Sequence, residues 1–577
     1  MNKNDHSKII SQFLPIIMVF LSPFLGLFIV QFRSYDDMFY YSAILLLSAL
    51  VVVGYRFFTR KEYHTNTLDI SVMLFLSYIV LNRIFLSNSY PDAVFLLRSV
   101  IIVGAYVYMR SISKSEKAGV VLQKLFIAVG LVELIIVVLQ LFSIVHSNNP
   151  FFDVTGSYNN PSMLGGILLL SAISALSFSL KDDISIRKRM IYSFICLMLA
   201  VGVFVSSSRS ALVSLVICSF FLLIRTFLSR KKSPNRRGSF IGVIFFIMLL
   251  LVGVIVYINH IDIYNEARIL IWRVSWDIFR DYPLFGAGIG SFASNYPYYQ
   301  ANYFMNNPDS LFSTVSGDNY QAYNLIISIL CELGIVGCLF FAAIIFYIFR
   351  CKGSFDLKIL FISTTIFLLF NNLFDSLTIV ICYVSIMAMI SAKSTGADYR
   401  IANSRGISII AGVVIVSLFV YIIWVKSRFD NTLHGLQELS DGQIENTLNI
   451  DESIVFSYRP FMVSYSEIVF EKLDPENAIT VLDDVLKRMA TARQVTLAGD
   501  LYYEMGEISK AEEFYYLADN MVPSRIIPSY KLFVLFKDTG QNDKAKTMAE
   551  YILNKEVSVV SSVTLRVRAE AKEYLKF

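Results

Sequence analysis

The stretch YNLIISILCELGIVGCLFFAAIIFYIF, residues 323–349, is an almost unbroken apolar run that carries one charged side chain, Glu332. At about 1.5 Å of rise per residue, such a run can cross the roughly 30 Å hydrocarbon core of a bilayer as a single helix. A carboxylate inside a membrane is costly, and it marks either a functional site or a structural partnership. We expect a structural role for Glu332, paired with an arginine or capping a broken helix, and likewise for Glu133 in another run.

Apolar runs of this kind recur along the first three quarters of the chain. Of the 577 residues, 55% are hydrophobic and only 16% are charged, and the mean hydropathy is +0.59. The runs lie near residues 13–32, 39–58, 68–86, 94–109, 121–145, 162–180, 190–206, 210–228, 240–259, 323–349, 357–374, 377–392 and 407–425. This composition is that of a membrane protein, and it predicts an all-α polytopic helix bundle of about 12–13 spans.

Lysine and arginine alternate between the loops, which indicates how the bundle is inserted. The basic loops lie near residues 60, 110–117, 181–189, 230–237, 352–358 and 393–405, and the loops between them are nearly free of basic residues. Because short basic loops stay in the cytoplasm, the N-terminus is predicted inside. The long loop 260–322 and everything after residue 426 are then predicted outside the cytoplasm.

The C-terminal region, residues 427–577, differs from the membrane domain predicted for residues 1–426. Gly506 and Ala511 have counterparts at Gly540 and Ala545, an interval of about 34 residues that is typical of tetratricopeptide repeats. We therefore predict a helical domain resembling these repeats, with ordinary amphipathic hairpins as the alternative. Such a domain offers a surface for an acceptor, for the growing glycan or for a protein partner.

Several arginines are predicted near the extracytoplasmic face. Arg209 follows three serines in SSSRSALVSL, Arg98 lies near the outer end of its run, and Arg268 lies in the long loop. A guanidinium is permanently charged and offers a planar fork of donors that suits phosphate oxygens. This group fits a lipid-linked diphosphate, although Arg83 and Arg98 can instead reach the lipid headgroups.

The long loop contains ARILIWRVSWDIFRDYPLFGAGIGSF, residues 267–292. Arg268, Trp272, Trp276 and Phe279 are spaced by three and four residues, which predicts an amphipathic helix at the membrane surface. Aromatic side chains there can also stack on sugar rings. The glycines at 286, 288 and 290 lack the strand-to-helix context of a dinucleotide site, and we predict a tight turn.

The motifs YNNPSMLGG, SSSRSALVSL, RILIWRVSWDIFRDYPLFGAGIGSF and AYNLIISILCELGIVG, in this order, resemble the O-antigen ligase and polymerase superfamily. The resemblance implies a bacterial inner-membrane enzyme that moves a glycan from undecaprenyl diphosphate to an acceptor hydroxyl in the periplasm, without metal or nucleotide. It implies diphosphate binding by Arg209, Arg268 and Arg98. It implies substrate contacts at Trp272, Gly288 and Asn160.

One departure from the family pattern concerns the catalytic group. Tyr323 stands where the family has a histidine, followed by the matching Asn324 and the Glu-Leu-Gly at 332–334. Tyrosine, with an ordinary pKa of about 10, is a poor base at neutral pH but a competent hydrogen-bond donor. The candidate catalytic residues are therefore Tyr323, Asn324 and Asp318, with Glu266 as a further candidate base. A second departure is Ser162, where the family usually has asparagine.

The resemblance leaves several functions open. A ligase would transfer the glycan to the lipid A core or a similar acceptor, and a polymerase would join repeat units. A lipid-linked glycan transporter is a different class, but the chain shows no duplicated half. An inactive scaffold that presents its helical repeats is the third possibility, and Tyr323 is its best evidence. No nucleic-acid partner and no metal site are expected, and the six cysteines lie in or beside apolar runs.

Overall fold

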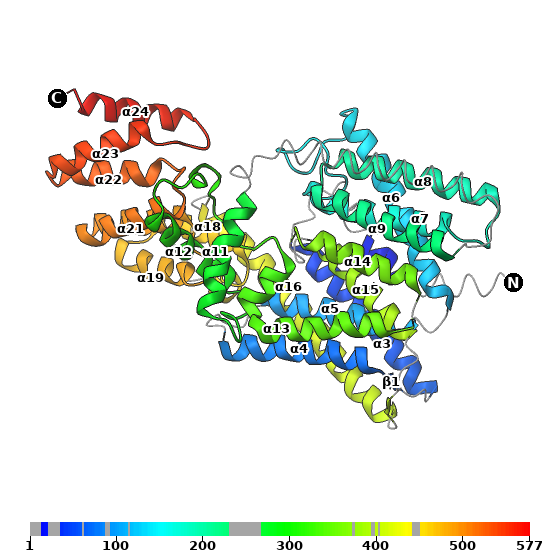
Figure 1. The fold of residues 1–577 in the computed structure, drawn as a ribbon. Coiled ribbons are helices and arrows are strands. Elements are labelled where there is room, and N and C mark those ends of the chain that lie inside the picture. Colours follow the sequence, from blue (N-terminus) through cyan, green and yellow to red (C-terminus); the bar gives the residue numbers. More distant parts are fainter. Residues whose placement is uncertain are drawn as a thin grey trace. The chain divides into compact units, whose positions relative to one another are not determined.

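The computed structural model describes residues 13–20, 35–59, 63–86, 93–112, 116–229, 267–352, 354–371, 376–393, 399–401, 404–440 and 450–576. Nearly all of its regular structure is helical (Figure 1). The one exception in these ranges is a short antiparallel pair, β1 (Tyr63–Thr65) with β2 (Tyr399–Ile401). The predicted all-α class is confirmed.

Nine helices in the described part of the chain are long and apolar enough to cross a membrane. They are α3 (Asp36–Thr59), α4 (Thr67–Leu86), α5 (Ala93–Ile112), α6 (Glu116–Leu141), α7 (Pro161–Ser179), α8 (Ile186–Val205), α9 (Arg209–Ser229), α13 (Leu325–Arg350) and α16 (Ser404–Ser440). Two further predicted runs form the shorter helices α14 (Phe355–Leu368) and α15 (Leu377–Ala392). The predicted run at 240–259 and most of the run at 13–32 lie outside the described residues.

The described residues divide between two compact units. The first is drawn from Met1–Leu76, Val94–His260 and Phe340–Val425. The second is drawn from Ser77–Ala93, Ile261–Leu339 and Lys426–Phe577. The predicted long loop and the predicted C-terminal domain thus contribute to the same unit.

A buried polar cluster ties three helices of the first unit together. Asp69, in the first turn of α4, accepts hydrogen bonds from Tyr106 Oη (2.7 Å) and Ser391 Oγ (2.6 Å). Its carboxylate also pairs with Arg110 (3.1 Å) near the end of α5. Asn66 and Asp69 each bond the other's backbone N–H at 3.0 Å, in the manner of a capping box. A buried carboxylate is tolerated here because so many donors surround it.

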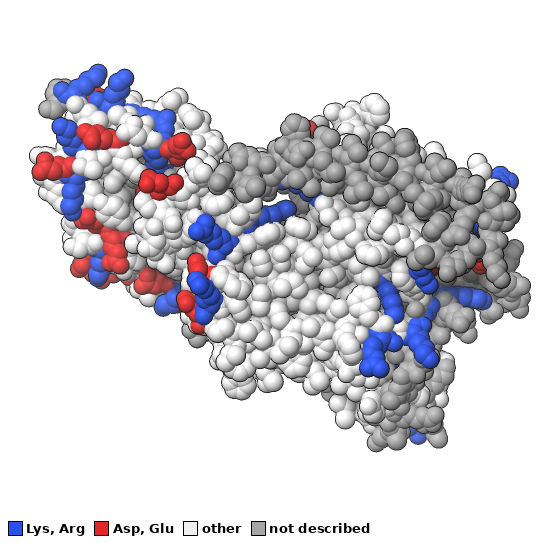
Figure 2. Space-filling model, in the orientation of Figure 1, with Lys and Arg blue, Asp and Glu red and all other residues white. Residues whose placement is uncertain are grey.

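The second unit contains α11 (Ala267–Asp281), α12 (Phe292–Asn306), the 3-10 turn Ser313–Val315 and a series of C-terminal helices. These helices are α17 (Glu452–Val455), α18 (Arg459–Lys472), α19 (Pro475–Leu486), α20 (Ala492–Glu504), α21 (Ile508–Met521), α22 (Ile527–Asp538), α23 (Asn542–Asn554) and α24 (Ser562–Tyr574). Figure 2 shows acidic and basic side chains mixed over α19–α24, whereas the visible surface of α4 and α13 is largely white.

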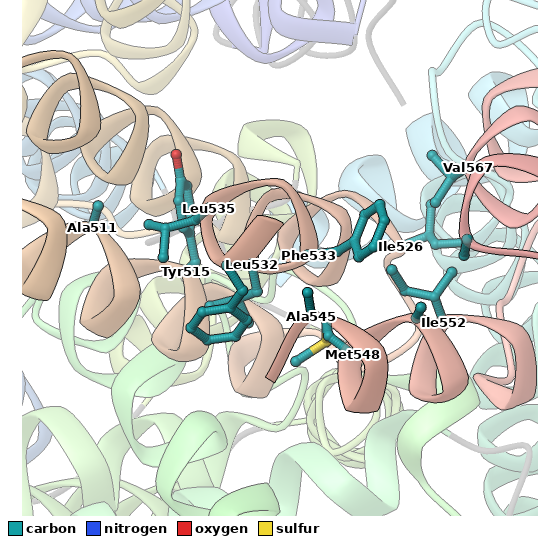
Figure 3. Close-up of a cluster of buried hydrophobic side chains, with 13 residues drawn as sticks. Ala511, Tyr515, Ile526, Leu532, Phe533, Leu535, Ala545, Met548, Ile552 and Val567 are labelled. Carbon is teal, nitrogen blue, oxygen red and sulfur yellow. The ribbon is translucent and has the colours of Figure 1, made fainter. Parts of the chain in front are cut away.

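The C-terminal helices pack as successive hairpins. Gly506 and Gly540 follow α20 and α22 with φ of 78° and 70°, a left-handed conformation that glycine adopts without strain. Gly499 lets α20 approach α21 closely, since a Cβ there would lie 2.6 Å from the Tyr515 ring. Ala511 and Ala545 are fully buried, and the core between these helices is apolar (Figure 3). Their assignment as tetratricopeptide repeats stays a prediction.

Candidate functional site

Residues 283–290, which contain Gly286, Gly288 and Gly290 and form the glycine-rich loop, pack into a break in α13. Gly334 interrupts the helix with φ 65° and ψ −164°. The backbone N–H groups of Ile335 and Val336 donate to the carbonyls of Pro283 (2.9 Å) and Leu284 (3.2 Å). In return, the N–H of Ala287 donates to the carbonyl of Cys331 (2.8 Å). Backbone polar groups freed at membrane depth must find protein partners, and this loop supplies them.

The C-terminal end of α4 holds the same loop. Tyr78 Oη donates to the carbonyl of Leu333 (2.7 Å), and Asn82 Nδ2 donates to the carbonyl of Phe285 (2.8 Å). Asn82 Oδ1 accepts from the N–H of Ile289 (2.8 Å). Arg83 Nη1 donates to the carbonyl of Ile289 (2.8 Å). Arg83 therefore holds the loop. The sequence pattern does not predict these partners, which lie 203 to 255 residues away along the chain.

Glu332 lies at this junction. Its Oε1 accepts a hydrogen bond from the N–H of Phe292 (3.4 Å) at the start of α12. The N-cap residue of α12, Ser291, makes no side-chain capping bond. A carboxylate near a helix N-terminus is favourable because it meets unsatisfied N–H groups and the positive end of the helix dipole. The structural role of Glu332 stays a prediction.

The predicted amphipathic helix of the long loop is α11. Trp272 Nε1 donates to the carbonyl of Ala322 (2.9 Å), so the indole is held against the segment that precedes α13. Arg268 lies one turn earlier, at a spacing that places it on the same face of the helix. The side chain of Trp276 is 53% exposed. Arg273 lies 5.1 Å from the centre of the Tyr303 ring.

Tyr323 and Asn324 precede α13 directly. Tyr323 has φ 48°, which is rare for a bulky residue and costs of order 1–3 kcal/mol. Its half-buried ring packs against the same apolar cluster as Trp272. Asn324 Oδ1 accepts from the N–H groups of Ile326 (2.9 Å) and Ile327 (3.1 Å), so this side chain caps the helix. The structure brings Trp272, Tyr323 and Asn324 together within one unit.

Asp318 is bonded to the C-terminal helices. Its Oδ1 accepts from the N–H of Ala492 (2.9 Å), and its Oδ2 pairs with Arg525 (2.6 Å). The nearby Tyr320 ring lies 3.1 Å from the Arg459 guanidinium. Burial raises the pKa of Tyr320 above its usual value, so its hydroxyl stays protonated at neutral pH. Glu266, the further candidate base, lies outside the described residues.

In the first unit, Arg209 is the first residue of α9 and is exposed. Ser207 before it has φ 56°, and its neighbours Ser206, Ser208 and Ser210 are buried. Asn371 Nδ2 holds Ser210 Oγ at 2.6 Å. An arginine at a helix N-terminus adds a full charge to the positive end of the helix dipole, which suits an anion.

The start of α7 lies beside this turn. A Cβ on Gly165 would come within 2.8 Å of Ser208 Oγ, so the two segments approach closely. Asn160 caps α7, because its side chain accepts from the N–H of Ser162 (2.8 Å). Arg98 lies on the second turn of α5 and is half-buried. The first unit therefore holds Asn160, Arg209 and Arg98, and the second holds Arg268, Trp272, Gly288, Asp318, Tyr323 and Asn324.

The described residues contain no group of three or more His, Cys, Asp and Glu side chains arranged to hold a metal ion. Residues 194–342 match a family model described as O-antigen ligase. The matched segment includes Arg209, α11, the glycine-rich loop and the break in α13, whereas Arg98 and Asn160 lie before it. A comparison with curated proteins gives no match.

Proposed function

Because residues 194–342 match a family model described as O-antigen ligase, we propose that the protein transfers a glycan from undecaprenyl diphosphate to an acceptor hydroxyl. This match suggests glycosyl transfer of the ligase or polymerase type, with a lipid-linked glycan and an acceptor as substrates. The observation that carries the proposal is the position of Arg209. It is exposed at the N-terminus of α9, inside the matched segment, two residues after Ser207, whose φ is positive.

In the proposed reaction, the acceptor oxygen attacks the anomeric carbon of the glycan. The bond from that carbon to the diphosphate oxygen breaks, and the diphosphate leaves with the bonding electrons. The acceptor proton passes to a base or to the departing diphosphate. Arg209 and Arg268, with Arg98 as a third, would stabilise the negative charge that builds on the leaving group. Charge stabilisation is the dominant need, and a base contributes less because the diphosphate is already a good leaving group.

The other site residues take supporting roles in this proposal. The Tyr323 hydroxyl would orient the acceptor as a hydrogen-bond donor. Trp272, with Gly288 and Asn160, would contact the glycan. Asn324 stays a catalytic candidate through the family pattern, and Asp318 stays one as a replacement for the absent histidine. The observed bonds of these two side chains cap α13 and α20.

We place the reaction at the periplasmic face of the bacterial inner membrane. The alternation of basic loops supports a cytoplasmic N-terminus and a periplasmic C-terminal domain. With this topology, Arg209, Arg268 and the C-terminal helices would face the periplasm, the side on which we propose the transfer. Fusions of a periplasm-active reporter after residue 577 would be active if the topology holds and inactive if it is inverted.

The second candidate is a repeat-unit polymerase of the same superfamily. Tyr323 favours it, because the histidine absent here is less regularly present in polymerases than in ligases. A deletion strain distinguishes the two. Loss of long chains with single repeat units left on the lipid A core indicates a polymerase. Full-length chains that accumulate on undecaprenyl diphosphate indicate a ligase.

The test of the proposal is complementation of that deletion strain with Arg209→Ala and Arg268→Ala. Each variant should insert normally and lose glycan transfer. Arg280→Ala is the matched control, because Arg280 lies on the same helix as Arg268 and its side chain is 68% exposed with only an exposed pair to Asp277. Full transfer by the Arg209 and Arg268 variants would contradict the proposed function and leave the transporter or the inactive scaffold.

A further inference from the structure

Segment 316–324 carries three of the candidate catalytic residues, and hydrogen bonds and ring contacts from other parts of the chain hold it in place. Its partners come from α11, from α12 and from the C-terminal helices, all within the second unit. Nothing in the local sequence of this polar segment predicts so many partners.

The strongest link joins Asp318 to the C-terminal helices. One carboxylate oxygen accepts from the N–H of Ala492, the first residue of α20, at 2.9 Å. The other pairs with Arg525, between α21 and α22, at 2.6 Å. The Asp318 side chain is only 10% exposed. A charge-assisted bond to a largely buried carboxylate is stronger than an exposed surface pair.

Two further links hold the neighbouring positions. The Arg459 guanidinium at the start of α18 lies 3.1 Å from the centre of the Tyr320 ring, a cation–π contact. Gln300 on α12 donates to the carbonyl of Gly317 (3.1 Å) and also to the carbonyl of Met521 at the end of α21. The same amide therefore joins the segment to α21.

The far end of the segment is fixed by α11 and α13. Trp272 holds the carbonyl of Ala322, and Asn324 caps α13. Tyr323 lies between these two contacts in a left-handed conformation. A strained backbone of this kind persists only where its surroundings determine it more than once.

We propose that Arg525 and Arg459 are positioning residues that hold segment 316–324, and with it Tyr323, in the geometry that glycosyl transfer needs. The C-terminal helices are then part of the catalytic machinery in the same chain, and not only a surface for a partner. The expected effect of Arg525 and Arg459 on the transfer rate rests on the proposed function. Their effect on the position of segment 316–324 does not.

The test combines two measurements on the full-length protein in lipid nanodiscs. Hydrogen exchange reports the protection of 316–324 directly. Steady-state transfer from an undecaprenyl-diphosphate-linked glycan reports kcat and the KM for the donor. In the double variant Arg459→Ala/Arg525→Ala, protection of 316–324 should fall and kcat should drop roughly ten- to a hundredfold. The donor KM should change by less than about twofold, because the diphosphate arginines are untouched.

Two control variants separate positioning from general damage. Arg525→Lys keeps a donor for Asp318 and should restore most of the protection and of kcat. Lys544→Ala removes an exposed pair with Glu512 (3.0 Å) in the same helices and should change neither.

Unchanged protection in the double variant would overturn the proposal, and so would lost protection with full kcat. The second result would leave the proposed function standing. Full transfer by Arg209→Ala would instead refute the proposed function without altering the exchange result.

Discussion

Gly286 and Gly334 meet where the glycine-rich loop enters the break in α13, and each has a positive φ, 75° and 65°. A Cβ on Gly334 would lie 2.6 Å from the N of Gly286, and a Cβ on Gly286 would lie 2.5 Å from the carbonyl O of Glu332. The loop and the broken helix can pair only because neither residue has a side chain.

Alanine at Gly334 should therefore be severely destabilising. The substitution combines a left-handed backbone with a clash against backbone atoms that cannot move aside, which corresponds to a loss of several kcal/mol. We expect little properly folded protein in the membrane, measured by detergent extraction and size-exclusion chromatography. Gly317→Ala is the control, since its Cβ would meet nothing within 4 Å. A monodisperse, active Gly334→Ala variant would contradict the close pairing of the glycine-rich loop with the broken helix.

Glu332 offers a test of structure against catalysis. Because its carboxylate accepts from the N–H of Phe292, glutamine can replace it as an acceptor. Glu332→Gln should keep at least about a third of the transfer rate, whereas Glu332→Ala should lower thermal stability by about 1–2 kcal/mol through the lost cap. Thermal unfolding and transfer rates of both variants check this. A stable but inactive Glu332→Gln enzyme would assign the carboxylate to catalysis.

Tyr323 should act through its hydroxyl. Tyr323→Phe keeps the ring in its apolar cluster and removes only the donor, so folding should be unaffected while kcat falls about tenfold. The comparison variant Tyr320→Phe alters a hydroxyl in the same segment and should keep full activity, since the Tyr320 ring face makes the contact with Arg459. Equal rates for Tyr323→Phe and the wild-type protein would remove Tyr323 from the mechanism.

A buried ion pair stabilises the C-terminal helices. Lys555, 5% exposed, donates to Asp519 (2.5 Å) and Ser529 (2.6 Å). Lys555→Met should destabilise these helices by about 3–5 kcal/mol, because the Asp519 charge would stay buried without its cationic partner. Lys544→Met, at an exposed pair, should cost less than about 1 kcal/mol. Denaturant unfolding, monitored by the hydrogen exchange of α21–α24, measures the loss of stability in both variants. Equal losses would contradict a buried role for Lys555 and an exposed role for Lys544.

The membrane helices and α11 could be predicted from the sequence because apolar runs and three-to-four spacing are local signals. The tight turn at 286–290 was also predictable, since glycine is the residue that adopts positive φ readily. Local signals do not give the partners of a loop. The break at Gly334 lies within an apolar run, and its hydrogen bonds reach back to residues 283–288.

The attachment of Asp318 could not be predicted for the same reason. Its partners lie at 492 and 525, and the charge pattern around them is that of any solvated helix surface. Asn160 and Asn324 were singled out by a family pattern, and both prove to be helix caps. A polar residue just before an apolar helix has this simpler explanation.

The most direct test of the account uses the purified protein in nanodiscs with an undecaprenyl-diphosphate-linked glycan, an acceptor glycan, and neither metal nor nucleotide. Release of undecaprenyl diphosphate is measured for the wild-type protein and for the Arg209→Ala/Arg268→Ala variant. If the two arginines hold the diphosphate, release depends on the acceptor and falls at least about a hundredfold in the variant. No release from the folded wild-type protein, or equal release from both, would contradict the proposed function.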